Sequence, residues 1–81
     1  MPNINVKIIT IPKERDIAQV YGILSVPLRK GFRAEMLEKH GIPESSIFRF
    51  LRTNQIPLIK RNAMVLVLNT YLKELGYVYG N

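Results

Sequence analysis

Hydrophobic and polar positions change their spacing along the chain, and each spacing predicts a different element. Residues 4–11 alternate β-branched with polar side chains and then run on as Ile-Ile-Thr-Ile, which predicts a strand that Pro12 ends. Four apolar residues then recur at helical spacing, and they predict a helix over residues 13–23: Ile17, Val20, Tyr21 and Leu24.

The start of the next helix has two interpretations. Residues 25–27 break the helical pattern, so a loop can run to residue 32 and the helix can begin at Arg33. Alternatively, Ser25 caps a longer helix that tolerates Gly31 at a cost of roughly 1 kcal/mol. Both versions end at Gly41, a residue type that accepts the left-handed conformation beyond a helix end. Two apolar residues of this helix are expected to face the core, Met36 and Leu37.

Two further helices are predicted after Gly41. Pro43 suits the first position of a helix over residues 43–53, whose apolar stripe consists of Ile47, Phe50 and Leu51. Pro57 ends it, and residues 58–75 carry apolar side chains at i, i+3 and i+4 spacing before Gly76. The β-prone tail Tyr77-Val78-Tyr79 can pair with the N-terminal strand or with a second copy.

These elements predict a mainly α fold, a single small domain over residues 1–81 with about four helices and a short N-terminal β-strand. Within it, residues 1–12 form a β-strand arm and residues 33–52 have helix-turn-helix spacing. Gly41 is the turn, Ile42 fills the gap between the two helices, and Ile47 and Phe50 hold the second helix on the first.

The segment EKHGIPESSIFRFLR resembles the lambda-repressor-like family of small helix-turn-helix regulators. The resemblance covers residues 33–75 and implies that the helix over residues 43–53 enters the major groove of double-stranded DNA. It also implies a transcriptional regulator of the repressor-like type found in phages, plasmids and bacterial operons. Leu37 stands where that family usually has a small alanine, and His40 where an apolar residue is common, which indicates a wider helix crossing.

The positive charge of the chain is concentrated in one segment. The net charge is +6, and residues 45–73 hold five basic side chains and no acidic one: Arg49, Arg52, Lys60, Arg61 and Lys73. Such a basic segment attracts polyanions. The alternative is a basic surface that serves solubility alone.

The predicted DNA contacts lie on the second helix of the motif and just after it. Arg49 and Arg52 share a face and can pair with guanine or grip phosphate, and Phe48 can touch a thymine methyl group or pack inside. Ser45 and Ser46 can contact DNA or cap the helix. The predicted DNA-binding residues are Ser45, Ser46, Phe48, Arg49, Arg52, Asn54, Lys60 and Arg61, the last two as phosphate contacts.

The sequence predicts neither an enzyme nor a metal or cofactor site, and no small-molecule substrate. It has no cysteine, its one histidine is His40, and no nucleophile has a base and an orienting group nearby. We therefore expect no catalytic residues and no cofactors. No signal-peptide pattern or membrane span is evident, which predicts a cytoplasmic protein with no membrane partner.

A homodimer is expected, because the run over residues 63–68 is apolar on every side of a helix and a domain of this size has little chain left to cover it. The alternative function is a protein–protein interaction or dimerisation module with no nucleic-acid role. In that case Gly41 is merely a corner in a helical bundle.

Overall fold

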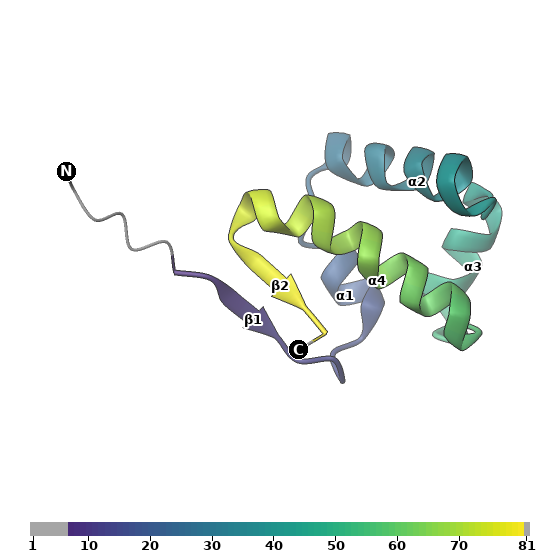
Figure 1. The fold of residues 1–81 in the computed structure, drawn as a ribbon. Helices are drawn as coiled ribbons and strands as arrows, with labels where there is room; N and C mark the ends of the chain where they lie inside the picture. The colour runs from purple at the N-terminus through teal and green to yellow at the C-terminus, as the bar shows by residue number, and fades with distance from the viewer. Residues whose placement is uncertain (1–6, 81) are drawn as a thin grey trace.

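The computed structural model describes residues 7–80, and it is mainly helical, with 65% of residues in helices. Four α-helices and a closing 3-10 turn lie between two short strands (Figure 1). In chain order the elements are β1 (Ile9–Ile11), α1 (Ile17–Tyr21), α2 (Val26–His40), α3 (Glu44–Thr53), α4 (Leu58–Leu72), η1 (Lys73–Leu75) and β2 (Tyr77–Tyr79). The mainly α fold with paired terminal strands is therefore confirmed.

The two strands pair in parallel, with Ile9 opposite Tyr77 and Ile11 opposite Tyr79. Asn69 of α4 fastens β2 to the helices, because its side-chain amide donates to the Tyr79 carbonyl and accepts from the Tyr79 N–H, both at 2.8 Å. The strand predicted over residues 4–11 is shorter in the structure, since its partner has only three residues. Residues 4–6 of that prediction lie outside the described residues.

The first helix is shorter than residues 13–23. Asp16 is the N-cap of α1, and its carboxylate accepts a hydrogen bond from the Ala18 N–H at 3.1 Å. Lys13 and Glu14 form a turn before this cap, and Gly22 ends the helix. The predicted helix is too long at its C-terminal end because Leu24 has helical spacing from Val20 and is buried. Leu24 nevertheless lies in the turn that follows α1.

The longer version of the second helix is the correct one. Ser25 occupies the N-cap position, and α2 continues through Gly31 to His40. Gly31 lies where α2 crosses α4, and a Cβ atom at this residue would stand 3.0 Å from the hydroxyl oxygen of Tyr71. The glycine therefore allows the two longest helices to approach closely.

The prediction that Leu37 faces the core is wrong. Phe32 and Met36 are buried one turn apart on α2, and Leu37, about 100° further around the helix, is exposed. The following stretch is as predicted, since α4 begins at Leu58 and the 3-10 turn η1 carries the chain to Gly76, whose φ is 84°. The helix of residues 58–75 thus ends in a tighter last turn.

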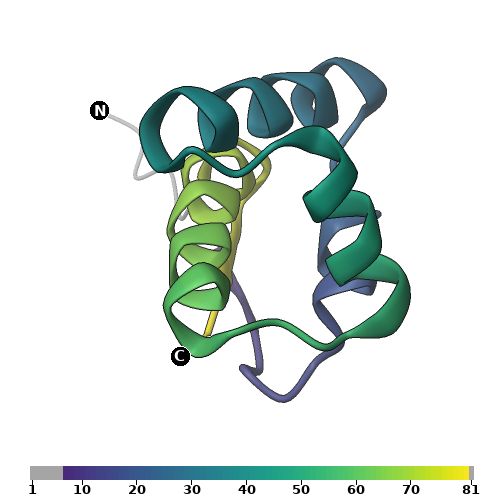
Figure 2. The same cartoon turned by 90° about the vertical axis from the view of Figure 1, so that its right-hand side faces the viewer.

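The core lies between α2, α3 and α4, with α1 behind them. Figure 2 shows α2 lying across one end while α3 and α4 stand on opposite sides below it. The buried side chains of the core come from all four helices and both strands, and the fully buried ones include Ile17, Phe32, Met36, Ile47, Met64, Leu68 and Tyr79. Among residues 7–80, no helix is long and apolar enough to cross a membrane.

Candidate nucleic-acid interface

The turn between α2 and α3 is built on Gly41. Its φ of 66° and ψ of 21° are left-handed. The Gly41 N–H donates to the Leu37 carbonyl at 3.1 Å, which is the αL capping motif, and the Ile42 N–H donates to the Met36 carbonyl at 3.2 Å. Ile42 and Met36 are both buried. The predicted turn is therefore present, and it delivers the chain into α3 at a defined angle.

Helix α3 is held by one apolar face. Ile47 and Phe50 are buried, and Leu51 is half-buried against the core. Pro43 takes the N-cap position and not the first helical position, so that α3 starts at Glu44. Because the burial follows helical spacing, the opposite face of α3 is left to solvent.

That opposite face carries four exposed side chains: Ser45, Phe48, Arg49 and Arg52. At about 100° per residue they fall within a sector of roughly 100° around the helix axis. We call this group the outer face of α3. The outer face combines two arginines with one aromatic ring and one hydroxyl, and Glu44 is the only acidic residue of α3. Arginine side chains can pair with base edges and phosphates, and an aromatic ring can touch an apolar group on a base edge.

Arg33 of α2 neutralises Glu44. Its Nε donates to Glu44 Oε2 at 2.8 Å and its Nη1 donates to the Tyr21 hydroxyl at 2.6 Å. The bond to Tyr21, followed by the bond to Glu44, raises the pKa of Arg33 above its usual value, so that the guanidinium stays charged. One side chain thus joins α1, α2 and the first turn of α3. No spacing along the sequence marks Arg33, because its partners come from separate helices.

Basic groups also gather beside Phe50. The Arg49 guanidinium carbon lies 5.3 Å from the centroid of the Phe50 ring, and Lys60 Nζ lies 5.7 Å from the same centroid. Lys60 belongs to the first turn of α4, so the structure brings this predicted phosphate contact next to α3. The positive charge of the outer face therefore continues onto the start of α4.

The remaining polar candidates lie at the two ends of α3. Ser46 is half-buried, and no side-chain cap hydrogen bond forms at the start of the helix. Asn54 is exposed and ends α3 in the left-handed conformation, with φ of 55°. The Thr53 hydroxyl donates to the Arg49 carbonyl at 2.9 Å and so tightens the last turn. Asn54 thus ends α3, in addition to any contact that it makes with DNA.

Arg61 lies apart from the outer face. Its Nη2 donates to the Lys13 carbonyl at 3.1 Å and to the Tyr79 hydroxyl at 2.8 Å, and its guanidinium stacks on the Tyr79 ring. The Tyr79 hydroxyl in turn donates to the Arg15 carbonyl at 2.7 Å. Arg61 therefore ties α4 to β2 and to the turn before α1, a contact that the sequence pattern did not indicate.

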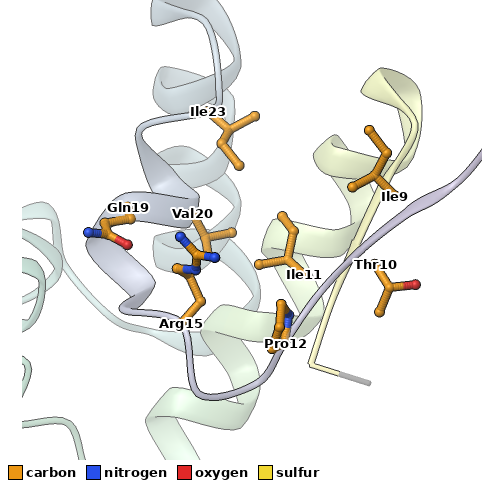
Figure 3. A pocket seen from close by; sticks show the side chains of 8 residues that line it. All are labelled: Ile9, Thr10, Ile11, Pro12, Arg15, Gln19, Val20 and Ile23. Atoms are coloured by element: carbon orange, nitrogen blue, oxygen red, sulfur yellow. The ribbon is translucent and has the colours of Figure 1, made fainter.

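A second surface feature lies between β1 and α1. It is a hollow of about 420 Å³ that Ile9, Ile11, Val20 and Ile23 line with apolar side chains (Figure 3). Arg15 and Gln19 supply its polar groups, together with Thr10. Within residues 7–80, no group of three or more histidine, cysteine, aspartate or glutamate side chains could hold a metal ion.

Comparison of the chain with models of protein families, with curated proteins and with solved structures found no match. The likeness to lambda-repressor-like regulators therefore depends on the helix-turn-helix residues of this chain alone.

Proposed function

We propose that this chain binds double-stranded DNA in a sequence-specific manner, with α3 in the major groove, as a small transcriptional regulator. One observation carries the proposal: α3 exposes Arg49, Arg52 and Phe48 on one face, with Lys60 of α4 beside them. Side chains of these types recognise base edges and phosphates. A regulator of the phage, plasmid or bacterial type would act in the cytoplasm, and a homodimer would bind two half-sites.

The test is binding to a duplex selected from a randomised library, followed across a salt series. Arg49→Ala and Arg52→Ala should each weaken binding to the selected duplex by roughly 1–3 kcal/mol, because each removes a base contact. Binding to unrelated duplexes should change less. Equal affinity of both variants and the parent chain for the selected duplex would reject α3 as the recognition helix.

Lys60 offers a separate readout. Lys60→Ala should weaken binding to all sequences alike and reduce the salt slope by about one, as expected for a phosphate contact. Lys73, exposed just beyond the other end of α4, is the matched control. Lys73→Ala should leave affinity and salt slope unchanged, and an equal effect of both variants would point to net charge rather than to a localised interface.

A protein-interaction module is the competing proposal, and one observation favours it. Leu58 and Ile59, at the start of α4, are 71% and 85% exposed, and these two neighbouring apolar side chains offer a surface for a partner to cover. The salt series separates the two proposals. Affinity for DNA falls steeply as salt rises, whereas apolar docking is nearly independent of salt and gives a negative heat-capacity change.

A further inference from the structure

Phe48 is an apolar residue in the middle of a polar face. It is 45% exposed, and it lies one turn after Ser45 and one turn before Arg52 on the outer face of α3. An aromatic side chain in this position adds little to the core, where Ile47 and Phe50 already hold the helix. The exposed part of its ring is therefore available to a binding partner of α3.

The guanidinium of Arg33 contacts the ring of Phe48. The Arg33 guanidinium carbon lies 5.3 Å from the ring centroid, within the range of a cation–π contact. The guanidinium is itself anchored by its hydrogen bonds to Glu44 and to the largely buried Tyr21. Only 20% of the Arg33 side chain is exposed, so it forms a fixed support. Phe48 thus presents its free surface in a restricted orientation.

The chemistry of the ring limits what it can recognise. Phenylalanine has no donor or acceptor for the polar groups of base edges or for phosphate oxygens. In the major groove of unmodified DNA, the apolar group on a base edge is the 5-methyl group of thymine. Arg33 also pairs Glu44, so the acidic group at the start of α3 repels nearby phosphates less.

We propose that Phe48, supported by Arg33, is a specificity-determining residue that contacts the 5-methyl group of a thymine in the bound site. The inference rests on the proposed function, since it requires α3 in the major groove. Arg33 is a positioning residue in this arrangement, because it acts through the Phe48 ring and need not touch DNA.

The experiment replaces each thymine of the selected duplex, one at a time, with deoxyuridine, which lacks only the methyl group. For the parent chain, one thymine should give about a fourfold loss of affinity, the value expected when one methyl group is no longer buried. Phe48→Ala should bind the thymine and uracil duplexes equally. Phe48→Leu should recover part of the difference, and Lys73→Ala, an exposed residue outside the outer face of α3, should keep all of it.

Arg33→Lys tests the support. Lysine keeps the charge but lacks the planar fork that makes both hydrogen bonds while stacking on the ring. The variant should therefore lose discrimination between thymine and uracil while keeping its affinity for unrelated duplexes. Thermal unfolding of each variant shows that the domain is still folded at the temperature of the titration.

The outcomes separate this inference from the proposed function. Tight, salt-dependent binding with no thymine sensitive to the substitution, or a Phe48→Ala chain that still distinguishes thymine from uracil, would overturn the inference and leave DNA binding intact. No salt-dependent binding to any duplex would overturn the proposed function and the inference together. A duplex carrying 5-methylcytosine at the same position should bind more tightly than one carrying cytosine there, because these two duplexes differ only in the methyl group.

Discussion

Gly41 adopts a backbone conformation that side chains with a branched Cβ rarely reach. A Cβ atom at this position would meet no atom within 4 Å, so the cost of a substitution comes from the backbone alone. We expect Gly41→Val to destabilise the domain by more than about 1 kcal/mol, measured by thermal or urea unfolding.

Gly41→Asn is the matched control, because asparagine tolerates the left-handed region, as Asn54 does at the end of α3. It should cost clearly less than Gly41→Val. A thermal midpoint that both substitutions leave unchanged would show that the turn does not depend on the left-handed conformation.

We expect the free energy of unfolding to depend on pH in the alkaline range, because Tyr79 titrates there. Burial raises the pKa of its hydroxyl above the usual 10.0, and the nearby Arg61 only partly opposes this. Burial and Glu35 raise the pKa of Tyr71 as well. Because the folded chain then holds protons that the unfolded chain releases, the free energy of unfolding should fall as the pH rises above about 10.

Urea unfolding between pH 8 and pH 11 measures this effect. Tyr79→Phe should lower stability at pH 8, because the Arg15 carbonyl and Arg61 each lose a partner. It should also flatten the decline above pH 10. A decline as steep in Tyr79→Phe as in the parent would assign the effect to other groups, and Tyr71→Phe then identifies the second contributor.

At the scale of elements, the crossing of α2 and α4 depends on Gly31 and Tyr71. Alanine is favoured over glycine inside a helix by roughly 1 kcal/mol, yet its Cβ would stand 3.0 Å from the Tyr71 hydroxyl oxygen. That hydroxyl is held by its bond to Glu35 at 3.2 Å. We therefore expect Gly31→Ala to lower the thermal midpoint, because crowding outweighs helix propensity.

The control is the same substitution in a Tyr71→Ala background, where the crowding is absent. There Gly31→Ala should raise the midpoint, and the difference between the two backgrounds gives the coupling energy. An equal effect in both backgrounds would mean that Tyr71 moves aside at no cost.

Local signals predicted part of this architecture. Gly41 and the apolar stripe of α3 could be located from the sequence because a left-handed glycine and helical spacing are properties of a few neighbouring residues. The outer face of α3 followed from that stripe. The ends of α1 could not be located in the same way, since they depend on whether Asp16 caps the chain there.

Contacts between distant elements could not be predicted. Leu37 directly follows Met36, and which of these two apolar side chains faces the core depends on how the rest of the fold packs against α2. Arg33 and Arg61 look like any other basic residue, and only the fold brings them to Tyr21 and Tyr79. The exposed residues of the candidate interface could therefore be predicted from the sequence, but the side chains that position them could not.

At the scale of the whole molecule, two surfaces compete as the contact of the expected homodimer. The apolar run Ala63–Leu68 is mostly covered by its own chain, since Met64, Val67 and Leu68 are buried and Leu66, 65% exposed, is its only exposed side chain. The edge of β1 is the better candidate for the dimer contact, because it exposes more apolar surface and unpaired backbone groups. Ile9 is 54% exposed beside the apolar hollow, and the hydrogen bonds of Ile9 and Ile11 to Gly76 and Gly80 point toward β2.

The alternation of a strand then directs the N–H and C=O of Thr10 to the opposite, unpaired edge. A two-stranded sheet with such an edge gains hydrogen bonds by adding a strand. A second copy can do so in the antiparallel direction, with Ile9 opposite the partner's Ile9 and Thr10 opposite the partner's Ile8. This register places apolar side chains together over the hollow.

The absence of cysteine from the chain makes this arrangement directly testable. In that register the two Cα atoms at position 9 form a pair without hydrogen bonds, about 4.5 Å apart, which is close enough for a disulfide. We expect Ile9→Cys to give a cross-linked dimer under mild oxidation at micromolar concentration, and Leu66→Cys to remain largely uncrosslinked. Sedimentation equilibrium of the parent chain, with and without DNA, measures the dimer independently. A monomer mass under both conditions would exclude the dimer, whereas cross-linking through Leu66→Cys instead of Ile9→Cys would transfer the contact to α4.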